Sequence, residues 1–195
     1  MLTLHTMSAY SASKTILVLG DSLSAEYGLA RGEGWVSLLQ KKMAAEKNTV
    51  PVINASISGE TTSGGKARLP ALLLKHQPAV VIIELGANDA LRGLSLAATQ
   101  ENLRTMIKDA KKSQAQVLLI GMQIPPNYGA DYTRQFSALF PKLAKETKSS
   151  LVPFMLRGVA DKIEFFQADR IHPAAAAHPT ILNNIWPQLK PLLVK

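Results

Sequence analysis

The sequence contains no cysteine among its 195 residues. This absence excludes a thiol nucleophile, a disulfide framework, and any zinc or iron–sulfur site built on cysteine. Charged residues make up only 18% of the chain, too few for a disordered protein. No apolar run approaches the roughly 18 residues that a membrane-spanning helix needs. With 47% hydrophobic residues, the chain can build the core of one globular domain.

A secretory signal peptide is not visible at the start of the chain, because residues 1–14 are polar and lack an apolar stretch. Residues 1–13 show no periodic pattern, so we interpret them as an unpatterned leader. We expect a single domain over residues 14–195.

Positive charge exceeds negative charge, with 22 Lys and Arg against 14 Asp and Glu, and a net charge of +8. A nucleic-acid binder gathers such charges and interleaves them with aromatic residues. Here they are spread over the polar faces of predicted helices: Lys41, Lys42, Lys66, Arg68, Lys108, Lys111, Lys112, Lys142, Lys145 and Lys148. We therefore expect no nucleic-acid partner, and at most a weak attraction to anionic membranes or acyl carriers.

Short apolar runs rich in branched residues alternate with longer segments of helical periodicity. The runs predict strands at 15–19, 50–54, 80–85, 117–122 and 151–154. The periodic segments predict helices at 35–46, 67–75, 97–112, 132–147 and 173–193. Pro70 is expected in the first turn of its helix, and Ser95 or Thr99 as the cap of the next one. Continuous apolar strands that alternate with helices indicate an α/β fold, with a parallel sheet covered on both faces.

Polar residues follow the ends of four of these strands. Gly20-Asp21-Ser22 follows the first strand, residues 54–60 the second, and residues 86–89 the third; Asp169-Arg170-Ile171-His172 comes after the fifth, past a short helical stretch. Because the carboxyl ends of parallel strands meet at one edge of a sheet, these groups converge. A hydroxyl, an amide, a carboxylate and an imidazole are the groups that acyl transfer to a serine requires.

Ser22 is the candidate nucleophile, with Ser24 as the nearest alternative. A serine hydroxyl needs a base to take its proton, and Ser22 lies at a predicted strand-to-helix turn where backbone N–H groups face a developing anion. His172 is the candidate base, and Asp169 can hold its imidazole in one tautomer. Alone, these residues also fit a turn serine and a surface Asp–His pair. The remaining histidines have no acid so placed: His5, His76 and His178.

Asn88, Gly59 and Ser22 are the candidate donors of an oxyanion hole. Asn88 offers a side-chain amide, while Gly59 and Ser22 offer backbone N–H groups. Asn88 alone also fits an Asx turn, and Gly59 alone fits a loop glycine.

At these residues the sequence resembles the SGNH hydrolases, also called the GDSL family, which are named for four blocks carrying Ser, Gly, Asn and His. The blocks occur here in family order, at residues 20–24, Gly59, 86–89 and 169–173, and the resemblance covers about residues 15–193. Further segments resemble the branch that contains bacterial thioesterase/protease/lysophospholipase enzymes and arylesterases: residues 54–61, 67–73 and 125–129.

This resemblance implies a flavodoxin-like three-layer α/β/α sandwich with a five-stranded parallel sheet. It also implies a Ser22–His172–Asp169 triad, an oxyanion hole from Ser22, Gly59 and Asn88, no metal or other cofactor, and a periplasmic or secreted location. We expect a monomeric serine esterase or thioesterase that acts on aryl esters, acyl-CoA-type thioesters or lysophospholipids through an acyl-enzyme on Ser22.

Two residues depart from the family pattern. Ala87 stands where the family commonly has glycine, which adds a methyl group beside the oxyanion hole. Arg170 stands where close relatives often have glycine, which brings a cation near the triad. Neither change removes a catalytic group.

We expect the acyl group to lie between residues 125–132, residues 63–68 and the loop before Asp169. The candidate substrate contacts are Asp21, Ala87, Pro125, Tyr128, Phe154 and Phe166, with Met155 and Phe165 as further apolar wall. A carbohydrate O-deacetylase on the same scaffold is the alternative enzyme. A flavodoxin-like binding module is the alternative from another class, although the turn after the first strand lacks a glycine-rich phosphate loop.

Overall fold

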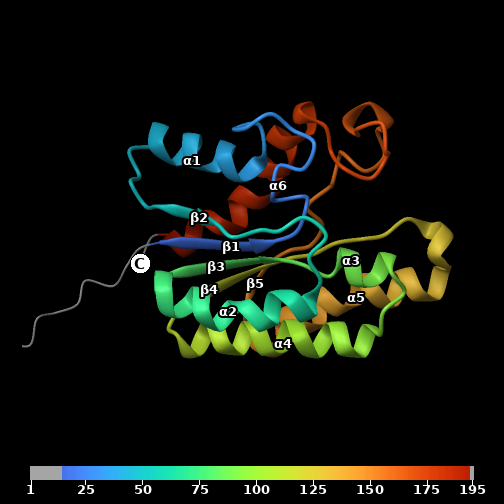
Figure 1. Ribbon diagram of the computed structural model, residues 1–195, viewed down its shortest axis with the longest axis horizontal. Helices are drawn as coiled ribbons and strands as arrows, with labels where there is room; N and C mark the ends of the chain where they lie inside the picture. Colours follow the sequence, from blue (N-terminus) through green and yellow to red (C-terminus); the bar gives the residue numbers. More distant parts are fainter. Residues whose placement is uncertain (1–14, 194–195) are drawn as a thin grey trace, which may run out of the picture.

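The protein is built around one five-stranded parallel sheet with strand order β2-β1-β3-β4-β5 (Figure 1). This computed structural model describes residues 15–193, so the predicted leader at 1–13 lies outside the described residues. The strands are β1 (Ile16–Gly20), β2 (Val52–Asn54), β3 (Val80–Glu84), β4 (Gln116–Ile120) and β5 (Ser150–Val152). All five predicted strands are therefore confirmed, with shifts of one or two residues at their ends.

Helices cover both faces of the sheet, which confirms the predicted three-layer sandwich. One layer holds α1 (Trp35–Ala45) and α6 (His178–Leu189); the other holds α2 (Thr62–His76), α4 (Leu96–Lys112) and α5 (Ala130–Thr147) (Figure 1). A short helix, α3 (Ala87–Leu91), lies at the carboxyl edge of the sheet. Single turns of 3₁₀ helix complete the described elements: η1 (Pro126–Tyr128), η2 (Ile163–Phe165), η3 (Ala175–Ala177) and η4 (Lys190–Leu193).

The central strands are buried along their whole length, as their unbroken apolar sequences predict. Every residue of β1 and of β3 is buried. Register pairs Ile16 with Val80 at one end of these strands and Gly20 with Glu84 at the other. Burial of both sheet faces removes apolar surface from water, which is the main favourable contribution to folding. The strand ends therefore form a rigid base for the loops that follow them.

Helix α2 begins five residues earlier than its pattern predicted, at Thr62 rather than at residue 67. The Thr61 side chain accepts a hydrogen bond from the N–H of Gly64 and caps the helix, and the helix then runs through a pair of glycines. Pro70 consequently lies in the interior of α2, not in its first turn. For α4, Ser95 is the cap, because its side chain accepts from the N–H of Ala98.

The connection after β1 also differs from the prediction of a strand-to-helix turn. Residues 22–28 form consecutive turns, and the first helix begins only at Trp35. The Glu26 carboxylate closes this connection by accepting hydrogen bonds from the N–H groups of Gly32 and Gly34 and from the hydroxyl of Ser37. Ser22 is therefore positioned by turns, and no helix begins beside it.

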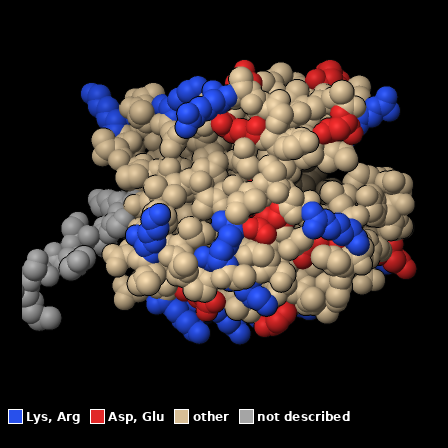
Figure 2. All heavy atoms as spheres, viewed as in Figure 1, with Lys and Arg blue, Asp and Glu red and all other residues tan. Residues whose placement is uncertain are grey.

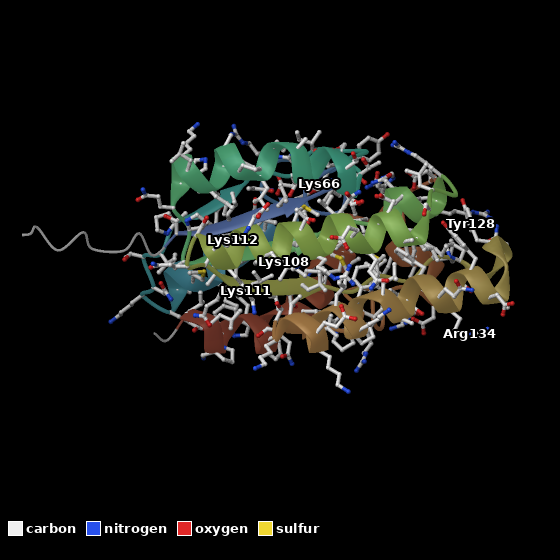
Figure 3. All side chains as sticks on the ribbon, turned by 90° about the horizontal axis from the view of Figure 1, so that it is seen from below. Lys66, Lys108, Lys111, Lys112, Tyr128 and Arg134 are labelled. Carbon is white, nitrogen blue, oxygen red and sulfur yellow. The ribbon has the colours of Figure 1, made fainter. Side chains whose placement is uncertain are left out.

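Charged side chains of both signs are dispersed over the surface shown in Figure 2. Lys66, Lys108, Lys111 and Lys112 lie along the layer of α2 and α4, far from Arg134 on α5 (Figure 3). Some of the cations are paired, as Arg104 is with Glu146. This distribution agrees with the expectation of solvated helix faces. Within residues 15–193, no helix is long and apolar enough to cross a membrane.

Candidate active site

The predicted site residues all lie in segments that follow the strands, at the carboxyl edge of the sheet. Ser22 follows β1, Gly59 follows β2, Asn88 lies in α3 directly after β3, and Asp169 and His172 lie between η2 and η3. Figure 2 shows a hollow at this edge of the molecule, beside the connection that carries η1. The sheet thus brings together groups that are up to 150 residues apart in the sequence.

His172 links Ser22 to Asp169 through both nitrogens of its ring. The Ser22 hydroxyl lies 3.0 Å from His172 Nε2, and His172 Nδ1 lies 2.7 Å from Asp169 Oδ2. When Nδ1–H donates to the carboxylate, the lone pair of Nε2 is left to accept the serine proton. This is the order of groups that activates a serine hydroxyl.

Asp169 is held as an anion by the backbone of its own turn. Its Oδ1 accepts hydrogen bonds from the N–H groups of Ile171, at 2.9 Å, and His172, at 3.0 Å. These two bonds, followed by the bond to the imidazole, lower the pKa of Asp169 to about 2. Arg170 allows the tight turn by adopting a φ of 59°, in the left-handed region, and its guanidinium makes no hydrogen bond or ion pair with residues 15–193.

Three potential oxyanion donors face the same edge. The backbone N–H groups of Ser22 and Gly59 donate to no other group of the described chain. Gly59 has a φ of 77°, which an L side chain rarely adopts. The Asn88 amide nitrogen donates to Asp21 Oδ2 and to the carbonyl of Glu60, both at 3.0 Å, so its N–H₂ side is fixed by two acceptors.

Ser24 and the other described histidines are occupied elsewhere. Ser24 is 1% exposed, and its hydroxyl donates to Glu84 and accepts from the Trp35 indole. His178 is buried and its Nδ1 accepts from the backbone N–H of Trp35. His76 ends α2, at the opposite edge of the sheet, and His5 lies outside the described residues. Among residues 15–193, Ser22 and His172 are the serine–histidine pair joined by a side-chain hydrogen bond.

The candidate substrate contacts occupy different positions relative to this site. Asp21 is 1% exposed and lies beneath the site, which leaves its carboxylate no surface for a substrate. Ala87 is nearly buried, and Met155 is fully buried in the core, so Met155 cannot form part of a wall. Phe154, Phe165 and Phe166 are half-buried and pack against the core. Pro125 and Tyr128 are exposed, and Tyr128 lies at the far end of the molecule from the lysines of α4 (Figure 3).

Sequence reasoning missed two residues that hold the loop of His172. The ring of Tyr27 lies against the imidazole of His172, with ring centroids 4.3 Å apart. The side-chain amide of Gln167 donates to the carbonyls of Tyr27 and Pro173, and its backbone N–H donates to the carbonyl of His172. These contacts join the first and last loops of the site, and no periodicity or spacing marks them in the sequence.

No group of three potential metal ligands occurs among the described residues. An open groove of about 760 Å³ lies at the amino edge of the sheet, lined by residues of α2 and α4, and it is remote from Ser22.

Residues 18–179 match the model of the GDSL-like lipase/acylhydrolase family. The chain belongs to this family. It is 52% identical over 192 residues to the esterase TesA of Pseudomonas aeruginosa, covering 98% of this chain and 96% of that protein. It is 45% identical over 183 residues to thioesterase 1/protease 1/lysophospholipase L1 of Escherichia coli K12, covering 94% of this chain and 86% of that protein.

The solved structure of another esterase has the same fold as this GDSL-like acylhydrolase. The psychrotrophic esterase EstA from Pseudoalteromonas sp., inhibited by monoethylphosphonate, superposes with a TM-score of 0.88 at 43% identity, covering 93% of this chain and all of that one. The predicted family, the enzyme class of ester hydrolase and the SGNH fold are therefore confirmed. The family match also favours the hydrolase over a non-catalytic binding module.

Proposed function

We propose that this GDSL-like acylhydrolase is a serine esterase and thioesterase that cleaves carboxylic esters and acyl thioesters. Ser22 is the nucleophile, His172 is the general base and acid, and Asp169 orients the imidazole. The observation that carries this proposal is the continuous line of hydrogen bonds from the Ser22 hydroxyl through His172 to Asp169.

The reaction begins when the Ser22 oxygen attacks the acyl carbonyl carbon and His172 Nε2 takes the hydroxyl proton. The imidazolium that forms is stabilised by the Asp169 carboxylate, which stays ionised. Collapse of the tetrahedral intermediate breaks the bond to the leaving alcohol or thiol, which receives the proton from His172. Water then attacks the acyl-enzyme with His172 as base, and Ser22 regains its proton as the acid leaves.

The carbonyl oxygen becomes negative in each tetrahedral intermediate, and three groups can donate hydrogen bonds to it. Two are the N–H groups of Ser22 and Gly59. The third is the amide of Asn88, which exchanges the Glu60 carbonyl for the substrate oxygen, because both of its hydrogens are donated in this structure. Loss of one such donor typically lowers kcat by about 10²–10³. Because the Ser22 and Gly59 N–H groups are held by the backbone and donate to no other group of the described chain, they need little reorganisation when charge develops.

Exposed apolar side chains around the site support a substrate with an aryl or acyl group. Within the described chain, the large hydrophobic side chains with high exposure include six in connections at the carboxyl edge of the sheet: Tyr27, Ile57, Leu94, Tyr128, Ile163 and Ile171. Exposed apolar side chains at the edge that carries the site suit an apolar ligand. The names of the relatives include esterase, thioesterase and lysophospholipase, and we extend these substrate classes to this chain.

The proposal is tested by replacing Ser22 with alanine. Ser22→Ala should lower the turnover of a p-nitrophenyl ester by several orders of magnitude, because it removes the attacking oxygen, and should abolish labelling by a fluorophosphonate probe. Ser58→Ala, at an exposed serine next to Gly59, is the matched control and should keep both. Turnover by Ser22→Ala at the wild-type rate, with the fold intact by circular dichroism, would contradict the proposal.

The substrate class is tested with acyl thioesters, aryl esters and glyceryl esters of increasing chain length. We expect hydrolysis of both esters and thioesters and a defined chain-length preference. Cleavage restricted to acetyl esters on sugars would favour the carbohydrate O-deacetylase instead. The periplasmic or secreted location, the weak contact with lipid and the monomeric state remain predictions, and size-exclusion chromatography with light scattering measures the last of these.

A further inference from the structure

Glu84 is a buried acid at the end of an otherwise apolar strand, directly behind the nucleophile. It ends β3, pairs in register with Gly20 of β1, and is 2% exposed. Its Oε2 accepts a hydrogen bond from the Ser24 hydroxyl at 2.7 Å and another from the Asp21 N–H at 3.3 Å. The Trp35 indole N–H in turn donates to the Ser24 hydroxyl at 3.1 Å. One carboxyl oxygen is thus tied to the turn that carries Ser22.

The absence of a side chain at Gly20 makes room for this arrangement. A Cβ atom at Gly20 would lie 2.8 Å from Glu84 Oε2 and 2.8 Å from the Ser24 hydroxyl oxygen, and both of these groups are buried. Real Cβ atoms do not approach other atoms so closely. The glycine that opens the Gly20-Asp21-Ser22 segment is therefore required by the position of the Glu84 carboxyl.

The carboxyl of Glu84 also neighbours the carboxyl of Asp21, whose own backbone N–H donates to Glu84 Oε2, so the two form a pair of buried carboxyl groups. Two buried carboxylates in contact cannot both be ionised, so the pair holds one proton. Burial and the facing charge of Asp21 raise the pKa of Glu84 well above its usual value. Burial also raises the pKa of Asp21, but only to about 6, because Leu23, Glu84, His172 and Asn88 favour its anion. The proton therefore resides on Glu84.

The Asp21 carboxylate connects this pair to two parts of the catalytic site. Its Oδ1 accepts from the N–H of Leu23 at 3.0 Å, which closes an Asx turn around Ser22. Its Oδ2 accepts from the amide of Asn88 at 3.0 Å. One buried carboxylate therefore holds both the nucleophile turn and an oxyanion donor.

We infer that Glu84, in its protonated form, is a positioning residue for the reaction: by donating its hydrogen bond to Asp21, it fixes the turn of Ser22 and keeps the N–H₂ side of the Asn88 amide in the oxyanion hole. This inference rests on the proposed function. If the Asn88 amide rotated by half a turn, its oxygen would face the Asp21 carboxylate and the Glu60 carbonyl, which are both acceptors. Asp21 excludes that orientation only while its own carboxylate is held in place.

Two substitutions at Glu84 separate this role from packing. Glu84→Gln keeps the shape, can donate N–H₂ to Asp21, and can accept from the Ser24 hydroxyl, as a protonated acid does. Glu84→Leu keeps similar bulk but has no donor or acceptor. We expect Glu84→Gln to stay within about threefold of the wild-type kcat, and Glu84→Leu to lose between about tenfold and about a hundredfold in kcat with little change in KM.

The comparison requires kcat per active site, counted by the end point of fluorophosphonate labelling, so that loss of folded protein does not count as loss of activity. Leu189→Ala is the control, because it truncates a fully buried side chain at the last residue of α6. It should lower the melting temperature while keeping kcat per labelled site. If Glu84→Leu does not fold, Asp21→Asn serves in its place, since its amide nitrogen would face a donor at Leu23 or at Asn88, and the same loss of kcat is expected.

The protonation of Glu84 has its own readout, which does not depend on turnover. Infrared spectra at pH 8 should show the C=O stretch of a protonated carboxylic acid in the wild type and in Ser22→Ala, and Glu84→Gln should lack it. Normal kcat per site in Glu84→Leu, or in Asp21→Asn if it is used, would overturn the inference. Equal loss in Glu84→Gln and Glu84→Leu, or no carboxylic acid band in the wild type, would overturn the assignment of the proton. Failure of the proposed function is distinct, because the wild type would then neither turn over esters nor label at Ser22.

Discussion

At the scale of single residues, the proposed mechanism depends on how firmly one imidazole is held. His172 donates to Asp169 on one side, accepts from Ser22 on the other, and has the ring of Tyr27 against its face. Asp169 in turn is fixed by two backbone N–H groups of its own turn. Because the pKa of Asp169 is lowered to about 2, it remains an anion throughout the pH range in which an esterase is assayed.

Replacing Asp169 with asparagine should lower kcat by about 10⁴-fold, because the amide allows the wrong tautomer of His172. The measurement is the hydrolysis of a p-nitrophenyl ester, with kcat and KM determined separately. Asp161→Asn changes an exposed acid that lies before η2, outside the loop of Asp169, and should leave both unchanged. A loss of less than about tenfold in Asp169→Asn would show that the hydrogen bond to Asp169 does not set the tautomer.

Tyr27→Ala removes the ring that packs against His172 and should lower kcat by about threefold to tenfold. This range follows from the value of about 0.5–1.5 kcal/mol for an aromatic pair. Tyr27→Phe keeps the ring and should retain the wild-type kcat. If Tyr27→Phe loses as much activity as Tyr27→Ala, the phenolic hydroxyl and not the ring contact is responsible.

At the scale of helices and strands, the sequence predicted the elements whose formation depends on a local pattern of residues. Branched apolar runs predicted all five strands, and periodicity predicted the long helices. The start of α2 was missed because two glycines in its first turns lower the helix propensity of that segment. The side-chain cap from Thr61 stabilises the helix there, and propensity alone does not show this. Helix α3 was missed because its five residues are too short for a periodic pattern.

The site residues were predictable because strand ends converge at one edge of the sheet. The residues that hold them in place were not predicted. Glu84 carries a signal that was available, an acid that ends an apolar strand at the edge where the site forms. Tyr27 and Gln167 carry no such signal, since their contacts join loops 140 residues apart. Long-range contacts between loops depend on the whole tertiary arrangement.

Helix α3 is anchored to α2 through Asp89, and this contact should contribute to stability. The buried carboxylate of Asp89 accepts from the N–H of Thr62 at 2.8 Å and from its hydroxyl at 2.5 Å. Thr62→Val keeps the shape but leaves a buried charge with one donor fewer, so the free energy of unfolding should fall by about 1–3 kcal/mol. Urea denaturation measures this change. Thr49→Val, at an exposed site, is the control and should change stability by less than about 0.5 kcal/mol.

At the scale of the whole molecule, the paired acids Asp21 and Glu84 couple stability to pH. Their raised pKa values mean that the folded protein keeps a proton that the unfolded chain releases above about pH 4. This stability is fully present below the pKa values of the unfolded chain and is lost as pH rises. Asp21 contributes to the loss up to about pH 6, and Glu84 continues it above that pH.

The free energy of unfolding of the wild type should therefore decline above pH 6 relative to that of Glu84→Gln, which has no proton to release at this position. The slope of the difference for one proton is at most about 1.4 kcal/mol per pH unit. Urea denaturation of both proteins from pH 6 to pH 9 measures this difference. Parallel curves would show that Glu84 is ionised in the folded protein.

The contact between Ser22 and His172 joins residues 150 positions apart, and it sets the order in which properties return during refolding. The Trp35 indole and its partner Ser24 belong to the first part of the chain, whereas the base arrives with the segment after β5. Contacts of such long sequence separation form slowly, because the chain must first close a large loop. Recovery of ester turnover therefore reports the docking of the last loop. In Trp186→Phe, which removes the second tryptophan from α6, the fluorescence of Trp35 follows the first part of the chain in the same refolding experiment.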